Sequence, residues 1–222
     1  MKVMIIGSSS KVSACLKQRL VRMGFDVLMA GRSGPDLKFD GFRASKEQVE
    51  HLVSEHCSAY IINMGVLYSK TISCQTIEQI EKSFHINLIA PVRVAEEILS
   101  KHRCARIFII GSESGAKGSF DTSYFLAKSG LRAYVRERAL AYPTQQLLLF
   151  SPSTISDAYM TTSRTDSKRL AEYLTRTPKG RFLTSDEVAG VVASFLNVEF
   201  EYFSNTEIEL NGGKFARMGR LT

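Results

Sequence analysis

Short apolar runs, each about as long as a β-strand, recur along this chain between segments with helical periodicity. The runs lie at residues 2–6, 26–30, 58–62, 105–110, 145–150 and 207–210. Strands joined through helices need crossover connections, which make the sheet parallel and place helices on both of its faces. The sequence therefore predicts an α/β protein with a single doubly wound parallel sheet.

Three of the intervening helices are marked by capping boxes. In this motif an N-cap hydroxyl and a Glu or Gln three residues later each bind the other's backbone amide. The pairs are Ser45 with Gln48, Thr76 with Gln79, and Thr184 with Glu187. No linker, repeat or low-complexity stretch interrupts the pattern, and 222 residues is an ordinary length for one domain. We expect residues 1–222 to form one domain.

The composition is that of an ordinary globular protein. Hydrophobic residues make up 44% of the chain and charged residues 23%, which excludes a disordered chain and a coiled coil. No apolar stretch is long enough for a transmembrane helix, and the N-terminus resembles a strand rather than a signal peptide. The cysteines, Cys15, Cys57, Cys74 and Cys104, lie far apart, which favours free thiols over disulfides or a metal site. We predict a cytoplasmic protein with no metal and no membrane partner.

The net charge of +7, from 29 basic and 22 acidic residues, suits an anionic partner. The basic residues are scattered, however, with no long run and no alternation with aromatic residues of the kind found in nucleic-acid-binding proteins. We expect a solvated basic surface with one phosphate site and no nucleic-acid partner. A nucleic-acid-binding protein is a remote alternative.

Ligands of doubly wound sheets bind beyond the carboxyl ends of the strands, so the residues after each strand are candidates for the site. The run 2–6 is followed by Gly7, three serines and Lys11, and then by a stretch that is typical of a helix. A small-residue turn at a helix N-terminus can hold a pyrophosphate. Arg32 follows the run 26–30, where a guanidinium can hold the 2′-phosphate of NADP. Taken alone, an ordinary turn and a surface arginine would also account for these residues.

Ser112 follows the run 105–110, and Tyr124 and Lys128 come soon after it. Their spacing places Tyr124 and Lys128 on one face of a helix. Because a neighbouring ammonium stabilises a phenolate, we expect Lys128 to lower the pKa of Tyr124 toward the range of a general acid or base. Asn87 lies inside a helical segment, where its low propensity indicates hydrogen bonds to nearby backbone.

Together these residues resemble the compact branch of the short-chain dehydrogenase/reductase family, nearly from end to end. The matching features are Gly7 in the nucleotide loop, Asn63-Met64-Gly65, Asn87, Ser112 before Tyr124-x-x-x-Lys128, Ser151-Pro152-Ser153, and the terminal Glu209-Leu210-Asn211-Gly212-Gly213. The resemblance implies a Rossmann fold and an oxidoreductase that interconverts a small carbonyl substrate and its alcohol. With Arg32 after the second strand, NADP(H) is expected as the cofactor in preference to NAD(H).

The resemblance also implies roles for individual residues. Tyr124 would exchange a proton with the substrate carbonyl oxygen, Ser112 would polarise the carbonyl, Lys128 would hold the nicotinamide ribose and tune Tyr124, and Asn87 would hold a water of a proton relay. The implied cofactor-binding residues are Gly7, Ser9, Ser10, Lys11, Arg32, Asn63, Gly65, Tyr124, Lys128, Pro152 and Ile155.

The glycine loop departs from the family pattern, because Lys11 and Ser13 stand where the second and third glycines are usual. The second glycine lets the backbone approach the pyrophosphate, and the third allows close packing of helix on strand. Lys11 must therefore swing aside or contact phosphate itself. These departures weaken the expectation of tight cofactor binding.

Residues 157–179 are expected to form a substrate lid, and its polar residues, with Arg164, Lys168 and Arg169, favour a polar or anionic substrate. A catalytically silent nucleotide-binding or scaffold protein on the same fold is the main alternative. A sugar-nucleotide epimerase or dehydratase would need a larger C-terminal substrate domain. By resemblance, helices at about 76–101 and 122–141 would pair in a homodimer or homotetramer.

Overall fold

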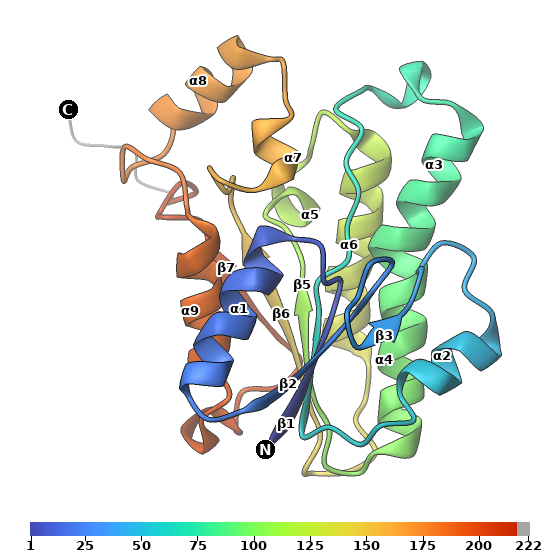
Figure 1. Ribbon diagram of the computed structural model, residues 1–222. Helices are drawn as coiled ribbons and strands as arrows, with labels where there is room; N and C mark the ends of the chain where they lie inside the picture. Colours follow the sequence, from blue (N-terminus) through green and yellow to red (C-terminus); the bar gives the residue numbers. More distant parts are fainter. Residues whose placement is uncertain (217–222) are drawn as a thin grey trace.

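A parallel β-sheet runs through the centre of the molecule (Figure 1). The computed structural model describes residues 1–216, apart from the side chain of Val198. In this part of the chain the seven strands follow the order β3-β2-β1-β4-β5-β6-β7, and every neighbouring pair is parallel. The strands are β1 (Lys2–Ile6), β2 (Asp26–Gly31), β3 (Leu37–Lys38), β4 (Ala59–Ile62), β5 (Arg106–Ile110), β6 (Gln146–Pro152) and β7 (Thr206–Leu210). The predicted doubly wound α/β fold is confirmed.

Helices cover both faces of the sheet. They are α1 (Lys11–Arg22), α2 (Lys46–Leu52), α3 (Ile77–Phe84), α4 (Ala90–Lys101), α5 (Ser114–Lys117), α6 (Thr122–Glu137), α7 (Tyr159–Thr162), α8 (Ser167–Thr175) and α9 (Ser185–Ser194), with the 3-10 turns η1 (Ile72–Cys74) and η3 (Val198–Phe200) and the π-helical turn η2 (His85–Ile89). Successive residues of β1 point to opposite faces. Ile5 packs in one core with Leu16 of α1, whereas Ile6 packs in the other with Val94 of α4 and Leu131 of α6.

The three capping boxes are confirmed. Ser45, Thr76 and Thr184 are the N-caps of α2, α3 and α9, and each hydroxyl accepts a hydrogen bond from the backbone amide three residues on. The Gln or Glu at that third position binds the N-cap amide in return. Local sequence thus sets where these helices begin, because each cap satisfies amides that the helix itself leaves unpaired.

The predicted strands agree to within two residues at each end, but one short strand and one helix end differ more clearly from the prediction. The strand β3 was not predicted, since its two residues carry no periodicity. The helix predicted to extend to residue 141 ends at Glu137, and Arg138 has extended backbone. The Asn205 side chain, remote in sequence, donates to the carbonyl oxygens of Val135 and Arg138 at 2.7 and 2.8 Å. A tertiary contact therefore satisfies the carbonyls at this helix end.

The strand order reverses beside β1, which has β2 on one side and β4 on the other. In open α/β sheets the ligand crevice lies at such a reversal, beyond the carboxyl ends of the strands. The short helices α7 and α8 lie above this end of the sheet (Figure 1, top). Because the strands are parallel, the residues that follow β1, β2, β4, β5 and β6 all lie at the same edge of the sheet, that of the carboxyl ends.

Other predictions concern the whole chain. The cysteines Cys15, Cys57, Cys74 and Cys104 are all free, as predicted. Among residues 1–216, no helix combines the length and apolar character that crossing a membrane would require.

Candidate active site

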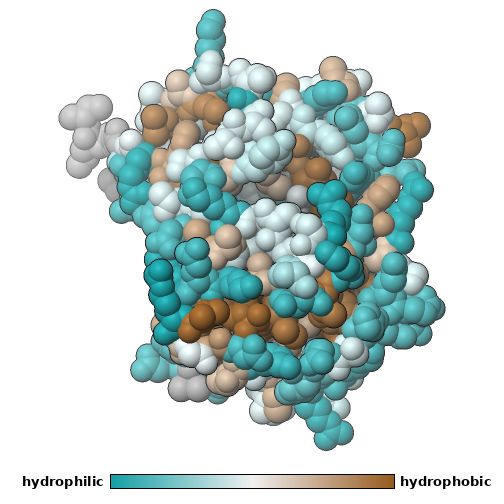
Figure 2. Space-filling view, in the orientation of Figure 1, coloured by the Kyte–Doolittle hydropathy of each residue, from teal (hydrophilic) through white to brown (hydrophobic). Residues whose placement is uncertain are grey.

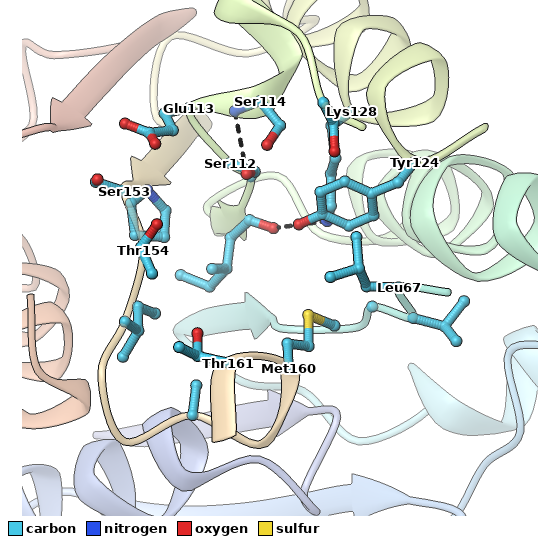
Figure 3. Close-up of a pocket in the computed structure, with 18 of the residues that line it drawn as sticks. Leu67, Ser112, Glu113, Ser114, Tyr124, Lys128, Ser153, Thr154, Met160 and Thr161 are labelled. Carbon is cyan, nitrogen blue, oxygen red and sulfur yellow. Dashed lines mark hydrogen bonds between the residues drawn. The ribbon is translucent and has the colours of Figure 1, made fainter. Parts of the chain in front are cut away.

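A cavity of about 1710 Å³ opens at the carboxyl ends of the strands. Its lining includes every predicted cofactor-binding residue: Gly7, Ser9, Ser10, Lys11, Arg32, Asn63, Gly65, Tyr124, Lys128, Pro152 and Ile155. Ser112 lines it as well, whereas Asn87 does not belong to the lining. Residues spread over most of the chain therefore meet in one cavity, and part of it is shown in Figure 3.

Gly7 cannot be replaced by another residue without moving the loop. Its φ of +106° is a conformation that side chains disfavour, and a Cβ there would lie 2.1 Å from the Asn63 carbonyl oxygen. Its amide donates to the Ala30 carbonyl oxygen of β2 at 2.8 Å. Gly7 thus allows β1, β2 and the turn after β4 to meet closely at the mouth of the cavity.

The serines that follow Gly7 build a hydrogen-bonded junction. Ser10 is the N-cap of α1 and accepts from the Ser13 amide at 3.0 Å. The Asn63 Nδ2 donates to the hydroxyls of Ser10 and Ser13 at 2.6 and 2.8 Å. Ser13, which is fully buried, donates in turn to the Gly7 carbonyl oxygen at 2.8 Å. Ser13 therefore links the loop, α1 and β4 at the position where a glycine was expected.

This junction fits the pyrophosphate of a dinucleotide. The first amides of α1 have no partner within the helix, and the helix dipole places partial positive charge there. Among the described residues, the Ser8 hydroxyl is buried and has no hydrogen-bond partner. Arg32 is exposed after β2, at the edge of the same cavity. The loop supplies donors at one end of the cavity and a cation at the edge nearest β2.

Ser112, Tyr124 and Lys128 form the opposite side of the site. Ser112 follows β5, and its hydroxyl accepts from the Ser114 amide at 3.2 Å. Tyr124 and Lys128 lie one turn apart on α6, and the Lys128 Nζ is 5.8 Å from the centre of the Tyr124 ring. Figure 3 shows the Tyr124 ring directed toward Ser112, with Lys128 beside it. The predicted trio is therefore brought together.

The predicted direction of the Tyr124 pKa shift is wrong in this arrangement. Burial raises the pKa of Tyr124, and a hydrogen bond with Ser112 only partly offsets the rise. Lys128 points its ammonium at the carbonyl oxygens of Ile110 and Met64, at 3.2 and 3.4 Å, rather than at the phenol. Burial also lowers the pKa of Lys128 to about 8, so the ammonium is charged at neutral pH but loses its proton more readily than an exposed lysine.

Asn87 lies one layer behind the cavity, within the π-helical turn η2. It is fully buried; its Oδ1 accepts from the Val66 amide at 3.0 Å, and its Nδ2 donates to the Val66 carbonyl at 2.9 Å and the Ser83 hydroxyl at 3.1 Å. The predicted bonds to nearby backbone are present. Single π turns are common at functional sites. Here the Asn87 side chain fixes the loop that presents Gly65 and Val66 beside the cavity.

Sequence reasoning missed Asp121, which positions Tyr124. Asp121 is buried at the N-cap of α6, and its Oδ1 accepts from the Tyr124 amide at 3.0 Å. Its Oδ2 accepts from the Tyr68 amide at 2.9 Å, and Gln75 donates to its Oδ1 at 2.7 Å. An aspartate just before a helical run was the available signal. This one carboxylate joins the loop after β4 to the start of α6.

A second missed feature is the ion pair between Glu113 and Lys214. The Lys214 Nζ lies 2.7 Å from Glu113 Oε1, and both side chains are largely buried. The pair binds the segment after β7 to the residue next to Ser112. No local signal could have predicted it, because its partners lie 101 residues apart.

The predicted lid residues, about 157–179, contribute to the lining through α7, α8 and the segments beside α8. They include Tyr159, Met160, Thr161, Arg164, Tyr173 and Arg176. Arg164 forms two hydrogen bonds with Asp166, at 2.8 and 2.6 Å. In Figure 2 the largest hydrophobic patch lies low in the view, away from α7 and α8 at the top. The lid end of the cavity combines apolar side chains, such as Met160 and Tyr173, with the cations Arg164 and Arg176.

Comparisons with known proteins agree with this geometry. A family model described as enoyl-(acyl carrier protein) reductase matches residues 42–214. The chain belongs to the short-chain dehydrogenase/reductase family. The 3-oxoacyl-(acyl-carrier-protein) reductase FabG of Salmonella typhimurium is 25% identical to it over 182 residues, which cover 79% of this chain and 70% of that protein. FabG of Rickettsia felis is 22% identical over 231 residues, with 95% of both chains covered.

Solved structures of short-chain dehydrogenase/reductases share the fold. An actinorhodin polyketide ketoreductase with NADPH superposes with a TM-score of 0.84 at 18% identity, over 96% of this chain and 97% of that one. An oxidoreductase of the family from Burkholderia thailandensis gives a TM-score of 0.81 at 20% identity, over 97% and 92% of the two chains. These structures show the fold, whereas the family is shown by the model that matches residues 42–214, and its members are oxidoreductases that use NAD(H) or NADP(H).

Proposed function

We propose that this protein is an NADP(H)-dependent oxidoreductase that interconverts a carbonyl and an alcohol on a small polar substrate. The observation that carries the proposal is the meeting of Ser112, Tyr124 and Lys128 with the Gly7 loop in one cavity. The FabG relatives, named as 3-oxoacyl reductases, and the ketoreductase with NADPH support carbonyl chemistry.

The bound dinucleotide would supply or accept the hydride. The Tyr124 hydroxyl would donate its proton to the carbonyl oxygen during reduction and take it back during oxidation. The phenol carries its proton at neutral pH, and because burial raises its pKa it holds that proton more tightly than an exposed tyrosine would. The Ser112 hydroxyl would donate a hydrogen bond to the same oxygen and stabilise the negative charge that develops there.

Lys128 and Asn87 would act around this pair. Lys128 would hold the ribose hydroxyls of the nicotinamide end. Its effect on proton release from Tyr124 stays a prediction, because its ammonium faces the carbonyl oxygens of Ile110 and Met64. Asn87 holds the Val66 loop through its side chain. Its proposed part in a proton relay through water stays a prediction.

The cofactor preference would come from Arg32. A guanidinium forms two parallel hydrogen bonds with a phosphate, so Arg32 at the edge of the cavity can select the 2′-phosphate of NADP(H). The residues Gly7, Ser9, Ser10 and Lys11 would hold the pyrophosphate, while Asn63, Gly65, Pro152 and Ile155 would line the path toward the nicotinamide.

The lid favours a polar or anionic substrate. Lys117, Arg164, Arg176 and Lys214 line this end of the cavity together with the carboxylates of Glu113, Asp121 and Asp166. Arg164 and Lys214 are paired with Asp166 and Glu113, which leaves Lys117 and Arg176 against Asp121. The surplus of cations would attract a carboxylate or phosphate on the substrate. Uncharged lipophilic ketones would lack that attraction.

Calorimetric titration with NADPH and then NADH is the direct test of this proposal. We expect micromolar binding of NADPH and weaker binding of NADH. A panel of ketones with matched carboxylate and methyl ester forms would then be assayed for cofactor oxidation, and the carboxylates should be favoured. Nucleotide binding without turnover of any carbonyl or alcohol would favour the silent scaffold protein. Failure to bind either nucleotide would overturn the proposal.

The assembly state and the cytoplasmic location stay predictions. Pairing through α3–α4 and α6 would give the proposed homodimer or homotetramer. Ile89, just before α4, and Leu126 of α6 expose hydrophobic side chains to solvent in the single chain. Covering such side chains would favour pairing at these helices.

A further inference from the structure

Lys11 and Asp157 form an ion pair beside the dinucleotide end of the cavity. Lys11 is the first residue of α1, and its Nζ lies 3.1 Å from Oδ2 of Asp157 in the loop after β6. The other oxygen, Oδ1, accepts from the amide and the hydroxyl of Ser185 at the start of α9, both at 2.8 Å. One carboxylate therefore holds both the Lys11 ammonium and the beginning of α9.

The ion pair has a short contact between charged groups, but it contributes little binding energy because both side chains are partly exposed. Partial burial alone would raise the pKa of Asp157, but hydrogen bonds from Ser185 and the charge of Lys11 lower it, so the carboxylate is ionised at neutral pH. The side chains of Lys11 and Asp157 are 57% and 30% exposed. Exposed pairs of this kind contribute little to stability, because solvent screens both charges. A more highly charged anion near Lys11 could therefore compete with Asp157 for its ammonium.

The pyrophosphate of a dinucleotide would be such an anion. Lys11 lines the cavity, and its own backbone lies in the first turn of α1, where phosphate oxygens are favoured. A pyrophosphate carries more charge than one carboxylate, and charge-assisted hydrogen bonds to phosphate are strong. Ser185 would still hold Asp157 after Lys11 leaves, so the exchange leaves the start of α9 in place.

We propose that Lys11 exchanges Asp157 for the pyrophosphate of the bound dinucleotide, and that Asp157 is an internal competitor that lowers cofactor affinity. The inference rests on the proposed function. It assigns a role to the lysine that stands where a glycine is usual: an ammonium supplies the phosphate contact that the close backbone approach would otherwise give. Asp157 then becomes a residue that sets affinity without touching the cofactor.

Calorimetric titration of the full chain with NADPH and with NADH, at low and high salt, tests the exchange. Lys11→Met should weaken both nucleotides by a similar factor, about five- to tenfold, because both contain the pyrophosphate. Asp157→Asn should tighten both by about threefold, since it frees Lys11 while its amide oxygen can still accept from Ser185. The double variant should bind like Lys11→Met alone, and the loss in Lys11→Met should shrink at high salt.

Lys17→Met is the matched control. Lys17 lies on the same helix but outside the cavity lining. Its substitution therefore removes the same charge from α1 without removing the proposed contact with the pyrophosphate. If Lys11→Met binds like Lys17→Met, or if Asp157→Asn binds more weakly than wild type, the exchange is refuted while the proposed function stands. Should Lys11→Met not fold, Asp157→Asn decides alone. If wild type binds neither nucleotide, the proposed function and this inference fail together.

Discussion

The ammonium of Lys128 lies 3.2 Å from the carbonyl oxygen of Ile110, at the end of β5, and is shielded from solvent on α6. This contact holds a charged group at the bottom of the cavity, one turn from Tyr124. Burial of an ammonium costs free energy, which is expressed in the lowered pKa of Lys128. The position is thus kept at the expense of stability, as is common at functional sites.

The cost should be measurable as a function of pH. The pKa of Lys128 is about 8 in the folded protein and near 10.5 when unfolded. The penalty is therefore complete below pH 8 and disappears as the pH rises to about 10.5. Lys128→Met should be more stable than wild type at pH 7, by up to about 3 kcal/mol, with little gain near pH 10.5. Urea unfolding of both proteins across this range would show it; a gain that does not change with pH would contradict the assignment.

Tyr124→Phe should abolish turnover and keep the fold. Removing a general acid lowers the rate by about 100-fold or more. The ring and its packing remain, so the NADPH affinity measured by calorimetry should stay within about twofold of wild type. Steady-state assays in both directions would measure the loss. A fully active variant would remove Tyr124 from the proposed mechanism.

Arg32→Asp should change the cofactor preference. A carboxylate repels the 2′-phosphate and can accept from a ribose hydroxyl, so NADPH should bind about tenfold more weakly while NADH is affected far less. Calorimetry with both nucleotides gives the ratio. An unchanged ratio would mean that Arg32 is only a surface residue. A similar loss for both nucleotides would place it at the pyrophosphate instead.

Ser13→Ala should destabilise the protein although the family tolerates a residue without a hydroxyl there. The substitution leaves the Gly7 carbonyl without its donor and removes one of the two acceptors of Asn63. The expected loss of unfolding free energy is about 1–2 kcal/mol. Ser9→Ala, which alters an exposed hydroxyl in the same loop, is the control for the denaturation experiment. Equal stability of the two variants would show that the junction contributes nothing.

Lys214→Met should cost more than removal of an exposed pair. It would leave the Glu113 carboxylate largely buried without its cation, which we expect to cost about 2 kcal/mol. The matched variant is Lys2→Met, whose partner Glu55 is exposed, and its expected cost is clearly smaller because solvent screens that pair. Thermal unfolding would compare them. A cost for Lys214→Met no larger than that for Lys2→Met would show that the segment after β7 is not fastened to the site.

The sequence predicted the architecture because its signals are local. The apolar runs gave the strands, and the capping boxes at Ser45, Thr76 and Thr184 gave three helix starts to the residue. The two residues of β3 carried no such signal, because pairing with β2 alone makes them a strand. The end of α6 depended on Asn205, whose contact with this helix cannot be read from the residues near position 138.

The site likewise has residues that local sequence signals could predict and features that depend on tertiary contacts. Gly7, Ser112, Tyr124 and Lys128 could be named from motifs, since each occupies a fixed place after a strand or on a helix face. The direction of the Tyr124 pKa shift could not, because helix spacing says nothing of burial or of where the ammonium points. The role of Asp121 as a helix cap could have been predicted from the sequence, but its hydrogen bond from the Tyr68 amide could not.

By itself, the sequence determined the alternation of strands and helices and the residue types at the strand ends, because periodicity and capping act over a few neighbouring positions. Only the tertiary structure decided which charges meet. Lys11 with Asp157 and Glu113 with Lys214 are pairs far apart in the chain. Their energies depend on burial and on distances of a few ångströms, which exist only once the sheet has brought the strand ends together.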